Sequence, residues 1–184
     1  MNRSLIIKDY SRQSEVYGIR GILTDAEVGG RESAQLTEGI GGCLKWKVLF
    51  LCANNGLYGP IAEALLRRID SEHFEALSAG ISPGGLHPLT VEVMNEIGID
   101  LTQKIPRCFE ELTNDTFDYV ITLGEKTFHH HNFHAAETIH WKLDNPIRAS
   151  NDPEKQLRTF RMVRDQIAQR LRLFVIVHVR PQAS

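Results

Sequence analysis

Cys52 is the residue of this sequence whose surroundings are best suited to chemistry. It follows an apolar run, residues 47–51, and precedes a loop that opens into a helical pattern near Pro60. Gly56 and Gly59 allow backbone conformations that turn successive N–H groups inward, and the start of the helix adds its positive end. A thiol in such a field loses its proton more readily. The pattern predicts an anion-binding loop with Cys52 as a nucleophile.

The residues predicted to line the anion are those between the thiol and the helix: Asn54, Asn55, Gly56, Leu57, Tyr58 and Gly59. Two other interpretations stay open on local chemistry alone. Cys52 could be a buried structural cysteine at a strand end, and Asn55 with Gly56 forms an ordinary turn sequence.

Alternating strand and helix patterns must position this loop. Apolar runs predict strands at residues 47–51, 74–79, 117–123 and 138–143, and apolar spacing predicts helices at 60–69, 90–97 and 152–173, the last capped by Asp152. This order predicts an α/β fold with a doubly wound, four-stranded parallel sheet, ordered 2-1-3-4, and helices on both faces. Ligands of such sheets bind beyond the carboxyl ends of the strands, where the Cys52 loop would lie.

Composition narrows the classes of partner. A net charge of −2 over 184 residues argues against nucleic acid or an anionic membrane. Three cysteines without metal or disulfide spacing suit the cytoplasm, and no signal peptide or membrane span is apparent. No cofactor is expected. Residues 1–44 hold half of the glycines and predict an extension of unclear structure, followed by one domain at 45–175 and a tail at 176–184.

Several separate segments resemble one family in the same order. They are VLFLCANNGLYGPIAEALL, LSAGISPGGLHPLTVEVMNEIGIDLTQ, FDYVITLG, IHWKLDNP and FRMVRDQIAQRL, which together span about residues 47–173. They resemble the low-molecular-weight protein tyrosine phosphatases and the thioredoxin-coupled arsenate reductases of the same fold, and are nearer to the arsenate reductase branch. The resemblance implies the phosphotyrosine phosphatase I-like fold.

The resemblance also assigns family roles to positions of this chain. Cys52 falls on the nucleophile and Asn55 on the asparagine that helps to hold the loop. Tyr58, however, falls where the family has the arginine that grips the oxyanion, and Asn145 falls on the aspartic general acid, with Asp144 one residue early. Gly59 stands in place of the family's serine.

In the arsenate reductase branch two further cysteines pass a disulfide onward. Those positions fall on Gly124 and near His131. Neither Cys43 nor Cys108 matches a shuttle position, and both are interpreted as isolated structural thiols. An arsenate adduct on Cys52 would therefore lack an intramolecular route to turnover.

These observations predict a phosphatase/arsenate reductase-like protein with impaired catalysis and a retained loop for a small oxyanion (phosphate, arsenate or sulfate) or a phospho-ligand. One alternative is an active enzyme in which Asp144 substitutes as the acid. Another is a non-enzymatic protein-interaction module with a protein partner. Lys104 and Arg107 could supply positive charge near the loop, although a solvated basic loop is the favoured interpretation.

The run FHHHNFH contains His129, His130, His131 and His134. His130 and His134 would share a helix face and could bind zinc, but no carboxylate or cysteine nearby completes a set of ligands. A polar loop beside the site is the favoured interpretation, and no metal is expected.

Overall fold

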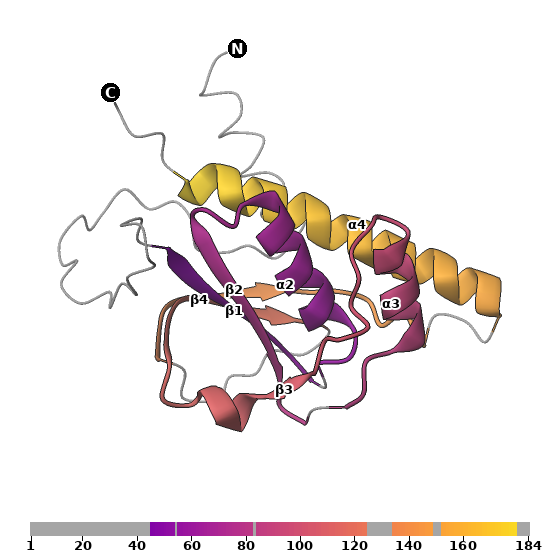
Figure 1. The fold of residues 1–184 in the computed structure, drawn as a ribbon, viewed down its shortest axis with the longest axis horizontal. Coiled ribbons are helices and arrows are strands. Elements are labelled where there is room, and N and C mark those ends of the chain that lie inside the picture. Colours follow the sequence, from indigo (N-terminus) through magenta and orange to yellow (C-terminus); the bar gives the residue numbers. More distant parts are fainter. Residues whose placement is uncertain (1–44, 54, 83, 125–133, 149–151, 180–184) are drawn as a thin grey trace, which may run out of the picture.

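A five-stranded parallel sheet forms the centre of the computed structural model, which describes residues 45–53, 55–82, 84–124, 134–148 and 152–179 (Figure 1). Its order is β3-β2-β1-β4-β5. The strands are β1 (Trp46–Cys52), β2 (Phe74–Gly80), β3 (Arg107–Cys108), β4 (Thr116–Leu123) and β5 (His134–Trp141). The predicted order of the four longer strands is confirmed. The prediction missed β3, because two residues are too few to show an apolar run or an alternation.

In the part of the chain that the structure describes, three α-helices accompany the sheet: α2 (Tyr58–Ile69), α3 (Pro88–Asn95) and α4 (Pro153–His178). α2 begins earlier than predicted, so that Tyr58 belongs to the helix. α3 also begins earlier, because His87 caps it and Pro88 is tolerated in its first turn. The predicted cap at Asp152 is confirmed, with its side chain accepting a hydrogen bond of 3.0 Å from the Glu154 amide.

The central strand β1 is buried on both faces, as expected for a parallel sheet. Val48, Phe50 and Cys52 join the larger core cluster with side chains of α2, α3 and α4. Leu49 and Leu51 point to the other face, where the short 3-10 helix η1 (Phe109–Leu112) covers them. Helical residues therefore lie on both faces, with the three α-helices gathered on the side toward which Cys52 points (Figure 1).

The last helix is longer than its sequence pattern indicated. It was expected to end at Leu173 and continues through His178, so the first residues of the proposed tail are helical. Phe160, Val163 and Ile167 are buried as predicted. Within the described part of the chain, no helix combines the length and the apolar character needed to cross a bilayer. The proposed extension at 1–44 lies outside the described residues.

Candidate functional site

Cys52 is the last residue of β1, at the carboxyl edge of the sheet, as predicted. Its register partner on β2 is Gly80. The residue is 1% exposed, and its sulfur lies 3.9 Å from Asn55 Oδ1 and 3.8 Å from the Ala79 carbonyl oxygen. The sequence suggested either a buried structural cysteine or the nucleophile of an anion-binding loop. In the structure Cys52 is both buried in the core and located at the base of the loop.

Asn55 gives the loop its sharp turn. Its φ of 49° lies in the left-handed region, which asparagine visits more readily than other non-glycine residues. The side chain is fully buried and donates a hydrogen bond of 3.1 Å from Nδ2 to the Ser78 carbonyl. One amide therefore ties the loop to the neighbouring strand β2 and also contacts the thiol. Asn54 lies outside the described residues.

The loop is also anchored to the start of α3. The Gly56 carbonyl accepts hydrogen bonds from the His87 amide, at 3.0 Å, and from the Thr90 hydroxyl, at 3.2 Å. Because C=O and N–H of a trans peptide point in opposite directions, the Leu57 N–H is turned away from α3. Leu57 occupies the N-cap of α2, and its side chain offers no acceptor to the first turn. The N-terminus of α2 is thus not capped by this residue, which suits an external anion.

Position 59 has no room for a side chain, so a glycine is required there. A Cβ placed there would lie 2.3 Å from Asn55 Oδ1 and 3.2 Å from both Cys52 Sγ and Ser78 Cβ. Any side chain at this position, including the serine found in the family that this sequence resembles, would have to displace the Asn55 amide. The glycine therefore belongs to the same arrangement as Asn55.

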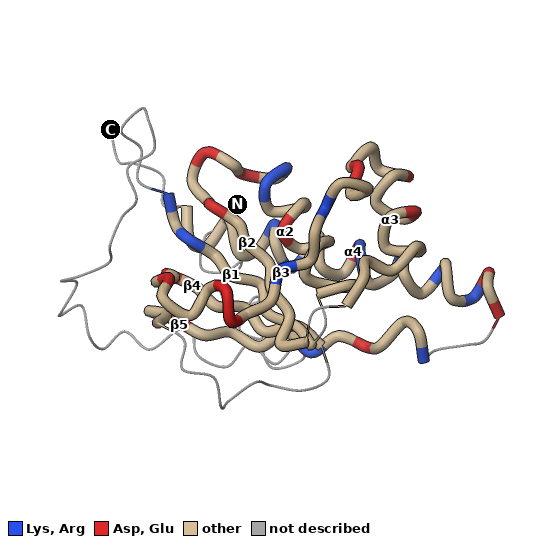
Figure 2. Tube along the Cα trace, turned by 60° about the horizontal axis from the view of Figure 1, so that its bottom comes forward, with Lys and Arg blue, Asp and Glu red and all other residues tan. Residues whose placement is uncertain are grey.

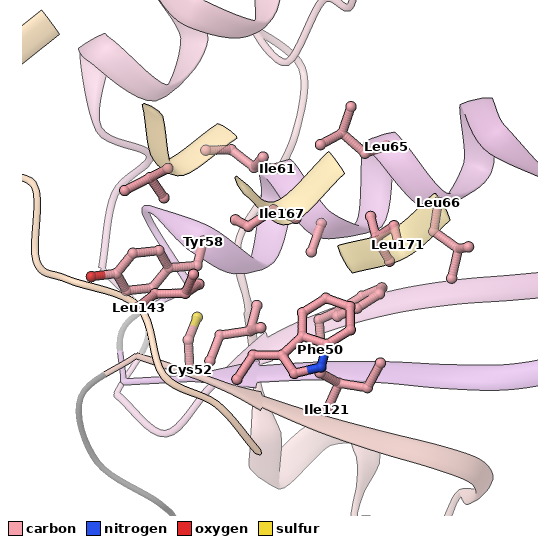
Figure 3. Packing of buried hydrophobic residues seen from close by; sticks show 14 of the residues in the cluster. Phe50, Cys52, Tyr58, Ile61, Leu65, Leu66, Ile121, Leu143, Ile167 and Leu171 are labelled. Atoms are coloured by element: carbon pink, nitrogen blue, oxygen red, sulfur yellow. The ribbon is translucent and has the colours of Figure 1, made fainter. Parts of the chain in front are cut away.

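Tyr58 lies in the core, where an arginine would be expected to face a ligand. The residue is 8% exposed and joins the main core cluster, and its hydroxyl donates a hydrogen bond of 3.1 Å to the Asp144 carbonyl. Figure 3 shows the ring on the helix side of the sheet with Cys52 and Leu143, its oxygen directed toward the loop that follows β5. Tyr58 thus fastens the first turn of α2 to that loop.

The two candidate acid residues lie in this same loop after β5. Asn145 is half-buried, and its side-chain oxygen accepts a hydrogen bond of 3.0 Å from the Ile147 amide. The amide therefore stabilises a local turn. Asp144 is exposed, and its carbonyl holds Tyr58. The structure thus brings the loop of Tyr58 and the segment of Asp144 and Asn145 together.

Gly124, the predicted position of the first shuttle cysteine, has a φ of 119°. That conformation strains any residue with a side chain, so the backbone here favours glycine. A Cβ at Gly124 would also lie 3.6 Å from the ring of Tyr58. His131, the second position, lies outside the described residues, as do His129, His130 and Cys43.

Two of the remaining predictions are corrected. Lys104 does not lie in a solvated loop, since its side chain is 17% exposed and its ammonium pairs with the buried carboxylate of Glu63 at 2.5 Å. His134 begins β5, so it shares no helix face with His130. Arg107 lies in β3. Among the described residues, no group of three or more histidine, cysteine or acidic side chains is placed to hold a metal.

Cys108 differs from Cys52 in its surroundings. It lies in the edge strand β3, half-buried, and its thiol contacts the Glu110 carboxylate. That hydrogen bond and the negative charge of Glu110 raise the pKa of the Cys108 thiol above its ordinary value. Cys108 is therefore a poor nucleophile at neutral pH.

Sequence reasoning missed the polar residues beneath the loop. Ser78 and Glu63 are buried and hydrogen-bonded to each other, with 2.5 Å between Ser78 Oγ and Glu63 Oε2. One signal was available, because Glu63 is the single acidic residue in α2 and stands between two alanines. Its partner Lys104 comes from a distant segment and could not be paired with it from the sequence.

His87 makes the loop's support sensitive to pH. Its Nδ1 accepts a hydrogen bond of 3.2 Å from the Leu89 amide, its ring stacks on Phe160, and burial lowers the pKa of the imidazole below 6.5. The folded state therefore disfavours protonated His87, so the contribution of this residue to stability is complete above pH 6.5 and is lost as pH falls below it.

We expect the variant His87→Asn to show a flatter loss of stability between about pH 7 and pH 5 than the wild type. Asparagine keeps an N-cap acceptor but does not titrate. Urea unfolding at several pH values measures the difference. Equal slopes for both proteins would show that another group titrates instead.

Comparison with known proteins identifies similar chains. A model of the low molecular weight phosphotyrosine protein phosphatase family matches residues 47–182. An arsenate reductase of Halalkalibacterium halodurans is 30% identical over 137 residues, which cover 69% of this chain and 93% of that protein.

Solved structures with a similar fold are also known. The structure described as an arsenate reductase in the phosphate binding state has a TM-score of 0.61 and 25% identity, covering 72% of this chain and 98% of the other. The tyrosine phosphatase Wzb of Escherichia coli K30, solved with sulphate, has a TM-score of 0.58 at 18% identity, covering 73% of this chain and 99% of Wzb, and supports the fold alone.

Proposed function

Since the chain belongs to the low molecular weight phosphotyrosine protein phosphatase family, we propose that it is a member that binds a small oxyanion but has lost most of its catalytic power. The observation that carries this proposal is the state of Tyr58. An arginine presents a rigid, charged fork to two oxygens of a phosphoryl or arsenate group. Tyr58 offers one neutral hydroxyl, and that hydroxyl is bound to the Asp144 carbonyl inside the core.

Retained binding is supported by the backbone of the loop. Asn55, Gly56 and Gly59 keep the turn that follows Cys52, and the N-terminus of α2 meets it. Phosphate, arsenate and sulfate match such a site, because each presents oxygens to backbone N–H groups and to a helix dipole. A phosphorylated ligand would bind through the same group.

Weak turnover is supported by two further positions. Asn145 cannot deliver a proton to a leaving alkoxide, and its side-chain oxygen is used in a local turn. Gly124 cannot accept a disulfide from Cys52, and its φ of 119° disfavours a cysteine. Phosphate ester hydrolysis therefore lacks its proton donor, and arsenate reduction lacks its disulfide-accepting cysteine.

The charge distribution agrees with a small ligand. Figure 2 shows acidic and basic residues interspersed along the described trace, and the formal net charge is −2. Such a surface does not favour nucleic acid or an anionic membrane. We propose that the binding domain begins at residue 45 and includes all of α4, through His178, and that it acts in the reducing cytoplasm, where Cys52 stays a thiol.

The proposal is tested by protection of Cys52 from iodoacetamide. Phosphate, arsenate and sulfate should each slow its alkylation in a saturable way, whereas chloride at equal ionic strength should not. Alkylation of Cys108 serves as an internal control, because its raised pKa keeps it slow at neutral pH and it lies outside the loop. Peptide mapping separates the cysteines. Alkylation of Cys52 that none of the three anions slows would refute oxyanion binding.

A further inference from the structure

A buried carboxylate beneath the Cys52 loop is held by donors from three segments. Glu63, on α2, is 2% exposed. Its Oε2 accepts from the Ser78 hydroxyl of β2 at 2.5 Å and from the Lys104 ammonium, in the segment between α3 and β3, also at 2.5 Å. Its Oε1 contacts Arg67 Nη2 at 2.8 Å. Of this cluster (Glu63, Arg67, Ser78 and Lys104), the sequence had pointed only to Lys104, as a possible source of positive charge near the loop.

The cluster is connected to the loop through Ser78. The Ser78 carbonyl accepts the hydrogen bond from the Asn55 amide, whose oxygen lies 3.9 Å from the Cys52 sulfur. Ser78 Cβ also limits the space at Gly59, where an added Cβ would approach it to 3.2 Å. A shift of Ser78 would therefore move Asn55 and open the turn after Cys52.

Lys104 is the cation on which this arrangement depends most. A carboxylate buried this deeply is costly unless it is paired. The Arg67 side chain is 53% exposed, so solvent screens its charge, whereas the Lys104 side chain is 17% exposed. The formal charges of Glu63, Arg67 and Lys104 are −1, +1 and +1, which leaves a net charge of +1 beneath the loop.

We propose that Lys104 is a positioning residue of the Cys52 loop: by neutralising Glu63 it fixes Ser78 and, through Ser78, the Asn55 turn that receives the oxyanion. This inference rests on the proposed oxyanion binding, but it concerns a residue that does not touch the anion. The loop lacks the arginine of its family, and a cation behind the loop supports it instead.

The first measurement compares Lys104→Met with the wild type in the iodoacetamide experiment, with inorganic phosphate as the probe. The variant should need about tenfold more phosphate for half-maximal protection of Cys52, a coupling of ordinary size between neighbouring sites. The pH profile of Cys52 alkylation without anion should also change. Lys104→Arg should restore both, and Lys142→Met, which removes an exposed lysine, should change neither.

A double variant separates positioning from direct contact. Glu63→Gln combined with Lys104→Met leaves no buried carboxylate to neutralise, keeps an acceptor for Ser78, and returns the cluster to +1 through Arg67 alone. If Lys104 acts by positioning the loop, the phosphate concentration that half-protects Cys52 in this double variant should return toward the wild-type value. Should the double variant remain as weak as Lys104→Met, Lys104 contacts the anion directly and the proposal is overturned.

The two proposals fail in different ways. Absence of phosphate protection in the wild type refutes oxyanion binding, while the pH profile of Cys52 alkylation still reports on Lys104. An unchanged profile and unchanged protection in Lys104→Met would overturn the role of Lys104. If Lys104→Met does not fold, the double variant decides, because a folded double variant with wild-type protection and pH profile supports positioning and one without them contradicts it.

Discussion

Replacing Tyr58 with alanine is expected to lower the free energy of unfolding by about 3–5 kcal/mol, the range for truncating a buried aromatic side chain. Tyr58 is 8% exposed and belongs to the main core cluster, and its ring lies beside the backbone of Gly124. Its removal leaves a cavity between the first turn of α2 and the loop after β5. Urea denaturation with an unchanged m-value measures the loss.

Tyr58→Phe is the matched control. It keeps the ring and removes the hydroxyl that donates to the Asp144 carbonyl, so it should cost about 0.5–1.5 kcal/mol. Met162→Ala, at a position 64% exposed on α4, should cost almost nothing. A loss below about 1 kcal/mol for Tyr58→Ala would mean that the ring is not packed as described, and Tyr58 would again be available to a ligand.

The second large effect concerns catalysis. Losing a preorganised charge donor costs on the order of 10²–10³ in rate, and losing a general acid costs about 10²–10⁴. If these losses were independent, they would multiply to roughly 10⁴–10⁷, although residues of one site are often non-additive. The variant Tyr58→Arg/Asn145→Asp should therefore gain measurable, Cys52-dependent hydrolysis of p-nitrophenyl phosphate.

The structure limits how complete this rescue can be. An arginine at position 58 forfeits the packing of the tyrosine ring, so the double variant will be less stable, and phosphate should stabilise it by mass action. Aspartate at position 145 can keep the acceptor that the Ile147 amide uses. Circular dichroism with and without phosphate shows whether the variant is folded under the conditions of the assay.

Arsenate reduction provides the internal contrast for the same variant. It should stay absent, because the new residues supply a charged donor to the oxyanion and a proton donor but no disulfide transfer through the positions of Gly124 and His131. Reduction of arsenate by the double variant, with thioredoxin as electron donor, would show that another cysteine resolves the adduct. Cys108 would then be the first to examine.

Much of the fold followed from local pattern. The apolar strand before Cys52, the turn residues after it and the helical spacing beyond Pro60 predict a strand, loop and helix unit, and β1 and α2 confirm it. Parallel crossovers then set the order of the longer strands. The boundaries of α3 and α4 were less predictable, because their ends depend on His87 as a cap and on packing around Phe174.

The sequence predicted the positions of some site residues but not the long-range contacts that hold them. The apolar run at residues 47–51 predicted Cys52 at a strand end, and the resemblance to a family suggested that Tyr58 replaces an arginine. Neither indicated that the Tyr58 hydroxyl would reach a carbonyl 86 residues further along the chain, or that Glu63 would pair with Lys104 across 41 residues. Long-range pairs of polar groups leave no periodic trace in a sequence.

The most direct test of the proposed loss of catalysis is the rate of p-nitrophenyl phosphate hydrolysis by the unmodified protein, with Cys52→Ser as the background. We expect the rate of the unmodified protein to exceed that of the serine variant only slightly or not at all, because Tyr58 is held in the core and Asn145 cannot donate a proton. A rate for the unmodified protein about a hundredfold or more above the serine variant would contradict this expectation, since a general acid alone contributes on that order. Asp144 would then be the first residue to replace, and the protein would be an active enzyme.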